Sequence, residues 1–259
     1  AGLPCRSGGA PAGARPEINR RVAEAGVHKE YRNILGYTFG TGLGVGSVID
    51  GRLNIGNNSC IETFCLPSKT NPGVMAEDYA SIRAVVREYN RLAGTSDTTL
   101  TPKDICEIAD GTRPGNAAAA RESFRLFGEA AGDAMATAVT LTDSLIVVGG
   151  GLTGAARYIM PGLLAQLRST IHTINGEQLQ RVQMSVFDLD DEAEFARFVK
   201  GDARQLKVYG SDKTVTYDPM KRTGVIISKL GASKAISIGA YTYALSQIDK
   251  ANQACGAEA

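Results

Sequence analysis

Glycines recur at every second position directly after a compact apolar run at residues 34–39. The cluster contains Gly40, Thr41, Gly42 and Gly44. Because glycine has no side chain, backbone N–H groups in such a loop can approach an anion closely, and the Thr41 hydroxyl adds one more donor. The pattern therefore predicts a cradle for a phosphate group. A glycine-rich strand or bulge in a crowded hairpin is the alternative interpretation.

A second glycine cluster lies about 110 residues later, between a short β-branched run and a helical pattern. It consists of Gly149, Gly150, Gly151 and Leu152, and together with Gly154 it matches the G-x-G-x-x-G spacing of dinucleotide-binding loops. A dinucleotide loop should be followed roughly 20 residues on by an acidic residue that ends the next strand. Here that distance falls within or just after a predicted helix, so a hydride-transfer enzyme is the weaker interpretation.

The order of the two clusters is informative. A hairpin loop that comes first and a strand–glycine–helix loop that follows could hold one nucleotide from two sides. We therefore expect both loops to face one cleft, as they would in a phosphoryl-transfer ATPase core.

Strands and helices alternate around these loops. Strands are predicted at 34–39 and 144–148, and the pair Asp50-Gly51 predicts a tight hairpin turn between two short runs. Helical spacing is predicted over 17–30, 75–92, 104–110, 115–141, 156–172 and about 233–249, and a second hairpin over 205–218. The helix at 115–141 carries an apolar stripe with many small residues beside it, which predicts close packing on a sheet.

The domain organisation follows from the composition and the apolar periodicity along the sequence. Residues 1–20 are assigned to a loose tail or junction, because most of them are Gly, Pro, Ala and Arg without apolar periodicity. Residues 21–259 are assigned to one mixed α/β domain, with a more polar excursion at about 175–230.

Three stretches in the same order resemble the ROK family of sugar kinases and repressors. They are YTFGTGLGVGSVIDGRL, GEAAGDAMATAVTLTDSLIVVGGGLTGAARYIMPGL and KLGASKAISIGAYTYAL. The likeness covers residues ~31–172 and ~225–248 and is confined to the family's C-terminal lobe. It implies an actin-like, ribonuclease-H-like ATPase lobe with a mixed sheet and packed helices. It also implies ATP and Mg²⁺ as cofactors, a hexose as substrate, and a possible homodimer.

Three residues are candidates for contacts with the sugar. Glu77, in a Glu-x-Tyr-Ala-Ser context, resembles a family glutamate that contacts sugar hydroxyls, and Glu62 lies where the family's sugar-binding glutamate would fall. Asn58 could donate hydrogen bonds to sugar oxygens.

Many of these kinases carry a zinc site of one His and three Cys, but here only Cys60 and Cys65 lie in that region, so no metal site is predicted.

Two motifs of the kinase pattern are missing from the sequence. No strand carries D-x-G-x-T, and residues 1–39 contain no Asp that could accept the proton of the sugar hydroxyl. The catalytic base is therefore unknown, and we expect the chain to be inactive alone. The alternative is a non-catalytic sugar- or nucleotide-binding module such as the effector domain of a ROK repressor. A repressor needs a helix-turn-helix, and residues 1–30 are too short and too rich in Gly and Pro to form one.

Composition excludes several other classes of protein. The 28 Lys and Arg residues balance 27 Asp and Glu without a basic block, so nucleic acid is not expected as a partner. No apolar run approaches the ~20 residues of a membrane span, so no membrane partner is expected either. The five cysteines show no paired spacing, which favours a reducing cytoplasm over a disulfide framework.

Overall fold

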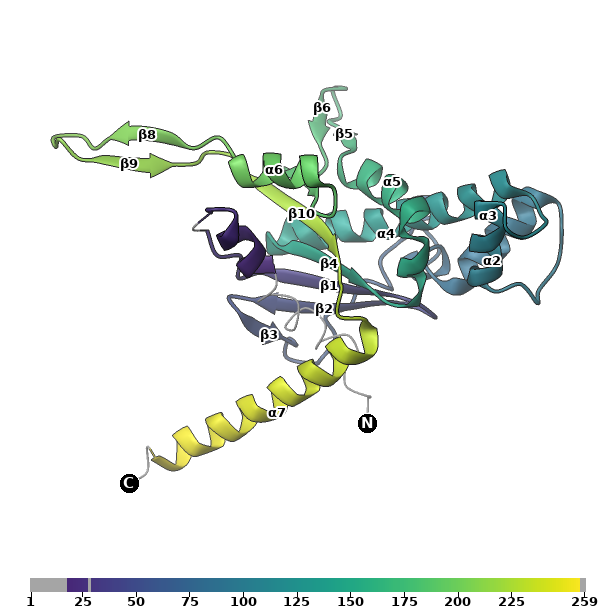
Figure 1. Cartoon of the computed structure of the whole chain (residues 1–259), viewed down its shortest axis with the longest axis horizontal. Helices are drawn as coiled ribbons and strands as arrows, with labels where there is room; N and C mark the ends of the chain where they lie inside the picture. Colours follow the sequence, from purple (N-terminus) through teal and green to yellow (C-terminus); the bar gives the residue numbers. More distant parts are fainter. Residues whose placement is uncertain (1–17, 28, 257–259) are drawn as a thin grey trace.

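A computed structural model describes residues 18–27 and 29–256, and a six-stranded sheet forms its centre (Figure 1). The strand order is β3-β2-β1-β4-β10-β7. Strands β1, β2 and β3 are antiparallel neighbours, whereas β1, β4, β10 and β7 run parallel. The strands are β1 Ile34–Phe39, β2 Leu43–Ile49, β3 Arg52–Asn54, β4 Leu145–Gly149, β7 Ser185–Asp188 and β10 Arg222–Ile227. The predicted mixed α/β architecture is confirmed.

The hairpin turn between β2 and β3 forms where the sequence predicts it. Asp50 and Gly51 have φ angles of 48° and 76°, and two successive positive values are what a tight turn between twisted strands requires. The first glycine cluster, in contrast, is mostly strand. Gly44 lies in β2 opposite Thr38 of β1, so the loop itself is only Gly40–Gly42.

Helices surround the sheet at nearly the predicted places. They are η1 Ala76–Asp78, α2 Ile82–Ala93, α3 Pro102–Asp110, α4 Ala117–Thr142, η2 Gly151–Ala155, α5 Ala156–Leu167, α6 Glu192–Lys200 and α7 Ala232–Gly256. The prediction of one helix over 156–172 is wrong at its end. Thr170–His172 forms β5, which pairs with β6 at Gln178–Gln180, because β-branched residues and a turn glycine at 176 favour a hairpin there.

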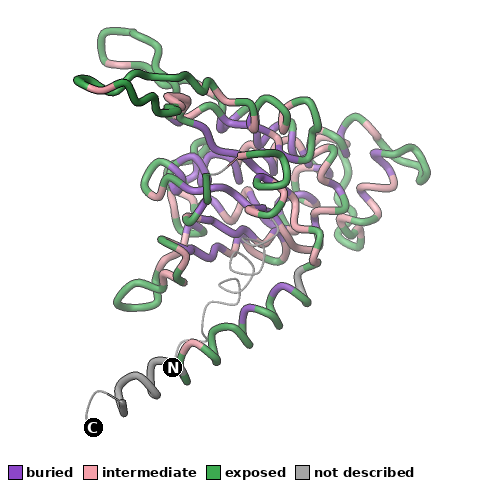
Figure 2. The backbone as a smooth tube through the Cα atoms, turned by 60° about the vertical axis from the view of Figure 1, so that its left-hand side comes forward, coloured by how far each residue is buried: buried purple, intermediate pink, exposed green. Residues whose placement is uncertain are grey.

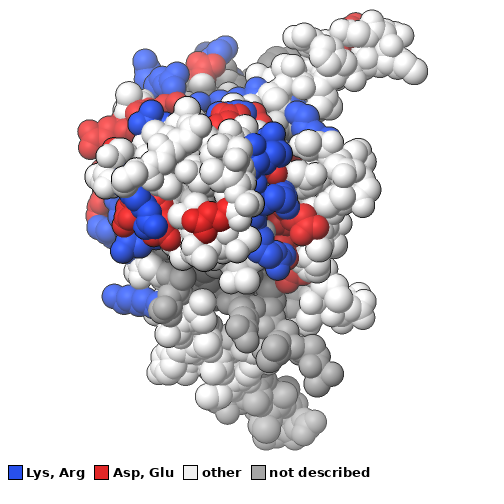
Figure 3. Space-filling model, turned by 90° about the vertical axis from the view of Figure 1, so that its right-hand side faces the viewer, with Lys and Arg blue, Asp and Glu red and all other residues white. Residues whose placement is uncertain are grey.

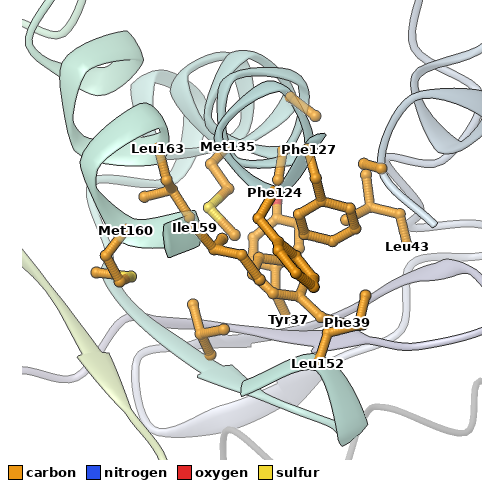
Figure 4. Close-up of a cluster of buried hydrophobic side chains, with 14 of the residues drawn as sticks. Tyr37, Phe39, Leu43, Phe124, Phe127, Met135, Leu152, Ile159, Met160 and Leu163 are labelled. Atoms are coloured by element: carbon orange, nitrogen blue, oxygen red, sulfur yellow. The ribbon is translucent and has the colours of Figure 1, made fainter. Parts of the chain in front are cut away.

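Alternation along the strands places a hydrophobic core on each face of the sheet. Leu35, Tyr37 and Phe39 of β1 belong to the core that contains residues of α4 and α5. Figure 4 shows Tyr37 and Phe39 beside Phe124 and Phe127. The residues that alternate with these along the strands face the opposite side of the sheet. They pack with Phe198 of α6 and with a helical segment at 18–24. Both faces of the β1–β4 pair are therefore covered, and only its ends are left open for ligands.

Helices α4 and α5 approach each other backbone to backbone. A Cβ added to Gly132 of α4 would stand 2.7 Å from the Leu163 carbonyl oxygen, and one added to Gly162 of α5 would stand 3.2 Å from the Glu129 amide nitrogen. The glycines among the small residues of α4 therefore serve contact with α5, whereas its aromatic residues meet the sheet. Phe127 lies edge-on to Phe39 with ring centroids 5.0 Å apart. The prediction that small residues pack on the sheet is corrected in this respect.

The predicted boundaries need two corrections. Residues 18–20 belong to the helical segment rather than to a tail, because Ile18 is buried; the rest of the predicted tail lies outside the described residues. The excursion at 175–230 contributes β7 and β10 to the central sheet. Only two hairpins in this part of the chain leave the body: β5–β6, and β8 at Arg204–Lys207 paired with β9 at Thr214–Tyr217 (Figure 1).

Two surface features complete the fold. Helix α7 runs away from the body and is largely exposed along its described part (Figure 2). On the face formed by α2 and α3, positive and negative side chains are interspersed rather than gathered in one field (Figure 3), as in the pair Arg91–Glu88. Within residues 18–27 and 29–256, no helix combines the length and the apolar character needed to cross a bilayer.

Candidate functional site

The two glycine loops meet at one edge of the sheet. Strands β1 and β4 are parallel neighbours with Thr38 opposite Gly149, so both chains leave the sheet at the same end (Figure 1). Gly150 also lies against the end of β1, because a Cβ there would stand 2.7 Å from the amide nitrogen of Phe39, the residue before the first loop. The two loops therefore leave the sheet side by side; that they face one cleft and hold one nucleotide stays a prediction.

The first loop is held from outside by the segment that leads into α2. The Ile82 amide donates a hydrogen bond of 2.9 Å to the Gly40 carbonyl. The Leu43 amide donates one of 3.0 Å to Oε2 of Glu77, and that carboxylate lies where a side chain on Gly42 would be. Glycine at 42 is therefore required by Glu77, and Glu77 anchors the loop.

The second loop is shaped by its own hydrogen bonds. Gly150 has a φ of 102°, which side chains disfavour, and its carbonyl accepts a 2.8 Å bond from the Thr153 hydroxyl. Leu152 is only 4% exposed and packs in the core, so a ligand could meet its backbone but not its side chain. Leu152 therefore stays a predicted nucleotide contact through its backbone.

Both loops present free backbone donors. Among the described residues, no hydrogen-bond acceptor is found for the amides of Thr41, Gly42 or Gly150. Backbone N–H groups without a partner at a glycine turn are suited to bind an anion. A Cβ on Gly40 or Gly151 would meet nothing within 4 Å, so both positions face open space. The arrangement can bind phosphate oxygens across the ends of β1 and β4.

A small hollow adjoins the second loop where α7 begins. It has a volume of about 10 Å³ and is lined by Gly149, Gly150, Ser228 and Ile236, among others. The Ser228 amide donates 2.8 Å to the Val148 carbonyl, which fixes β10 against β4 at this point. The start of α7, which lies in the stretch that resembles the family's closing helix, is therefore next to the second glycine loop.

The predicted sugar contacts are only partly brought together. Phe64 accepts a hydrogen bond from the Glu77 amide at 3.2 Å, so the loop that follows Glu62 runs beside η1. Glu77 also faces Arg83, with 3.6 Å between Oε1 and Nη2. Asn58 lies exposed in the turn after β3, and its carbonyl accepts a hydrogen bond from the Cys60 thiol.

A buried tyrosine lies close to Glu62. Burial raises the pKa of Tyr37 far above its usual range; the nearby Thr63 hydroxyl opposes that shift and the Glu62 carboxylate adds to it. The Tyr37 hydroxyl therefore stays protonated. Whether Glu62, Glu77 and Asn58 bind sugar remains a prediction.

Sequence reasoning missed a network of polar side chains that connects α4, α5 and the loop before η1. Arg181 pairs with the buried Asp133 of α4 at 2.5 Å, and Gln166 of α5 donates to the same carboxylate at 3.5 Å. Lys69, from the loop between β3 and η1, donates to Gln166 at 3.2 Å. The signal for this polar network was an aspartate in the otherwise uncharged stretch 130–142 of α4.

The acidic residues at 188–194 have structural partners. Asp191 caps α6 by accepting from the Glu194 amide, and Asp190 accepts from the Ile227 amide. Burial raises the pKa of Asp188.

Cys60, Cys65 and Cys106 are free thiols. Among residues 18–27 and 29–256, no group of three or more His, Cys, Asp or Glu side chains is placed to hold a metal ion.

Comparison with known proteins decides the family. The sequence model of the ROK family matches residues 9–193, which is more than half of the chain. The chain belongs to the ROK family. A comparison with curated proteins found no match. Among solved structures, a glucokinase from Parabacteroides distasonis shares 44% identity with this ROK chain at a TM-score of 0.85, covering 93% of this chain and 67% of that one.

Two more distant structures support the ROK fold. A ROK glucokinase from Streptomyces griseus, solved in complex with glucose and AMPPNP, has 20% identity and a TM-score of 0.54, covering 90% of this chain and 66% of that one. A ROK hexokinase from Thermus thermophilus has 16% identity and a TM-score of 0.53, covering 93% and 65%. The actin-like ATPase fold is thus confirmed. This ROK chain spans about two thirds of the length of these sugar kinases.

Proposed function

We propose that this ROK chain is the nucleotide-binding lobe of an ATP-dependent hexose kinase of the glucokinase type. The observation that carries the proposal is the meeting of two glycine loops at one sheet edge, with the amides of Thr41, Gly42 and Gly150 left without acceptors among the described residues. Two loops that converge from different strands suit a chain of phosphates better than a single anion. The 44% identity to a glucokinase supports the substrate class.

ATP fits the residues present. The Thr41 hydroxyl and the free amides of both loops would hold phosphate oxygens, and the open positions Gly40 and Gly151 leave room for close approach. ATP supplies the phosphoryl group to be transferred, and Mg²⁺ would come with the phosphates to neutralise their charge. The 10 Å³ hollow is too small for a nucleoside, so the adenosine would have to bind outside it.

On the sugar side, Glu62 and Glu77 supply carboxylates that can accept hydrogen bonds from vicinal hydroxyls. Oε2 of Glu77 holds the Leu43 amide and Oε1 faces Arg83 at 3.6 Å, so a sugar hydroxyl would have to share Oε1 with that guanidinium. Asn58 would complete the sugar contacts if the turn after β3 moved over the bound sugar. The free thiols of Cys60 and Cys65 support a cytoplasmic location as part of the same proposal.

The experiment compares glycine variants by calorimetric titration with AMPPNP and with NAD. Gly150 is unsuitable, because a side chain there would strike the Phe39 backbone before it met any ligand. Gly151→Val projects into open space, so the fold should persist while AMPPNP affinity falls at least tenfold, about 1.4 kcal/mol. Gly73→Val, also without close neighbours but in a different loop, is the matched control and should bind normally.

Two outcomes would contradict the proposal. One is tighter binding of NAD than of AMPPNP by the unsubstituted chain, which would restore the dinucleotide interpretation of Gly149–Gly154. The other is an unchanged AMPPNP affinity in a folded Gly151→Val variant. Far-ultraviolet circular dichroism and the melting temperature of each variant establish that it is folded.

A non-catalytic sugar- or nucleotide-binding module is the second candidate. One observation favours it, because the free backbone amides of the two loops can bind phosphate oxygens without any catalytic group. Such a module would bind AMPPNP and glucose without transferring phosphate even when the amino-terminal lobe of a ROK kinase is supplied, whereas a kinase lobe should then turn over, so turnover of the completed protein separates the two candidates.

A further inference from the structure

A two-stranded hairpin projects from the body at the end of the sheet opposite the glycine loops (Figure 1). It consists of β8 and β9, which pair with each other and with no other described strand. The hairpin precedes β10, whereas the glycine loops follow the carboxyl-terminal ends of β1 and β4, which run parallel to β10. The Asp218 carboxylate fixes the base of the hairpin by accepting hydrogen bonds from the amides of Asp202 at 3.1 Å and Met220 at 3.0 Å. The hairpin is therefore anchored at its base and distant from the glycine loops.

Alternation along the two strands gives the hairpin one apolar face and one polar face. Leu206 lies directly opposite Val215, and Tyr217 follows Val215 on the same side of the ribbon. The exposed fractions of these three residues are 44%, 50% and 53%. On the other face, the side-chain amide of Gln205 donates a 2.8 Å hydrogen bond to the Thr216 hydroxyl across the strands. The polar face is thus bonded within itself, whereas the apolar face has no cover among the described residues.

The shape of this apolar face points to a protein rather than a small molecule. Single exposed apolar side chains are ordinary, but three neighbours on one face of a ribbon form a contiguous patch, which is typical of interaction sites. A two-stranded hairpin is also only marginally stable in water without a layer packed on it. The ribbon has no walls that could enclose a small ligand, as binding pockets do. The face therefore suits a second flat apolar surface.

The charges of the hairpin favour a second copy of it over a charged partner. Residues 202–218 hold three basic and three acidic side chains, namely Arg204, Lys207, Lys213, Asp202, Asp212 and Asp218. Two ion pairs use four of them, with Arg204 2.5 Å from Asp202 and Lys207 3.2 Å from Asp212. The hairpin thus has no excess charge to attract an anionic membrane, a nucleic acid or a strongly charged protein. Two copies of it do not repel each other, and a neutral, flat apolar face is complementary to itself, as a two-fold contact requires.

We propose that the β8–β9 hairpin joins two copies of this chain, with Leu206, Val215 and Tyr217 of each copy packed on the same face of the other. Stacking two ribbons about a two-fold axis covers both apolar faces at once. At about 3.4 Å per residue and about 4.8 Å between strands, the face from Arg204 to Val208 is roughly 17 Å long and 10 Å wide. Such a contact falls well below the value of about 800 Å² per partner in stable complexes, so the dimer is reversible, with a dissociation constant in the micromolar range. The inference does not depend on the function proposed above.

The test is sedimentation velocity of the whole chain over concentrations that span the micromolar range. Leu206→Glu places an unpaired carboxylate in the contact from both copies, so the dissociation constant should rise at least tenfold. Leu245→Glu is the matched control, because Leu245 is the same residue type, is also 44% exposed and lies on α7. The control should associate like the unsubstituted chain. It also detects association through the exposed apolar residues of α7.

A second variant shows whether the two hairpins face each other. Leu206→Lys should be as monomeric as Leu206→Glu, whereas an equimolar mixture of the two should regain association, because opposite charges then meet across the contact. The proposal is overturned if the unsubstituted chain stays monomeric, if Leu206→Glu associates as tightly as that chain, if Leu245→Glu dissociates instead, or if the mixture does not recover. The melting temperature of each variant establishes that it is folded. AMPPNP affinity, measured in each variant, should be unchanged, so a failure of the nucleotide site is seen separately from a failure of this contact.

Discussion

The contact between α4 and α5 gives a direct test of the packing that supports the second glycine loop. Gly128 of α4 faces the backbone of α5, and a Cβ there would overlap the Ile159 carbonyl oxygen and stand 3.0 Å from the Leu163 amide nitrogen. Backbone atoms cannot turn aside as a flexible side chain can. Gly128→Ala therefore has to push the two helices apart.

The magnitude follows from two opposing effects. Alanine favours a helix interior by about 1 kcal/mol over glycine. Overpacking a close-packed interface costs about 1–3 kcal/mol, and contact with a backbone carbonyl places Gly128 at the upper end. The net loss of unfolding free energy is then about 2 kcal/mol, which corresponds to a fall in melting temperature of roughly 4–8 °C for a domain of this size.

Differential scanning calorimetry measures the effect, with Gly154→Ala as the control. Gly154 has nothing within 4 Å of an added Cβ, so its variant should melt within a degree or two of the unsubstituted chain. A Gly128→Ala protein as stable as the unsubstituted chain would refute the backbone-to-backbone packing. Equal destabilisation by both substitutions would show that the effect is not specific to the helix contact.

Two further predictions concern acid stability and turnover. Hydrogen bonds from Arg157, and then from Tyr158, lower the pKa of Asp110, so its contribution to stability is present at neutral pH and is lost as the pH falls through the folded-state pKa. The difference in melting temperature between the unsubstituted chain and Asp110→Asn should accordingly shrink below about pH 4, and a difference independent of pH would contradict this. In a coupled assay the purified chain should release no ADP in response to glucose above background, whereas robust turnover would reveal a catalytic base that the sequence does not show.

Much of the fold could be predicted because local signals and tertiary structure agree. The apolar run at 34–39 became β1 with the predicted bounds, and Asp50-Gly51 formed its turn, since both depend on neighbours in sequence. The end of α5 was missed because a hairpin competed with a continuous apolar pattern. The role of β7 and β10 was missed because short strands in a polar segment gain their place only by pairing with β4 and with each other.

The candidate site, too, could be predicted from the sequence only in part. That Gly40–Gly42 and Gly149–Gly151 lie together was predictable from their order and their glycine content. That Gly42 is required by Glu77, and Gly150 by the Phe39 backbone, was not, because those contacts join separate segments of the chain.

The central claim is that both glycine loops bind one nucleotide, and amide chemical-shift mapping tests it most directly. The chain is labelled with ¹⁵N and titrated with AMPPNP and Mg²⁺. The account predicts that the amides of Thr41, Gly42, Gly150 and Gly151 shift together with one common dissociation constant, while the amide of Gly73, in a different loop, does not follow. Shifts confined to one loop, two different dissociation constants for the two loops, or no shift at either loop would contradict it.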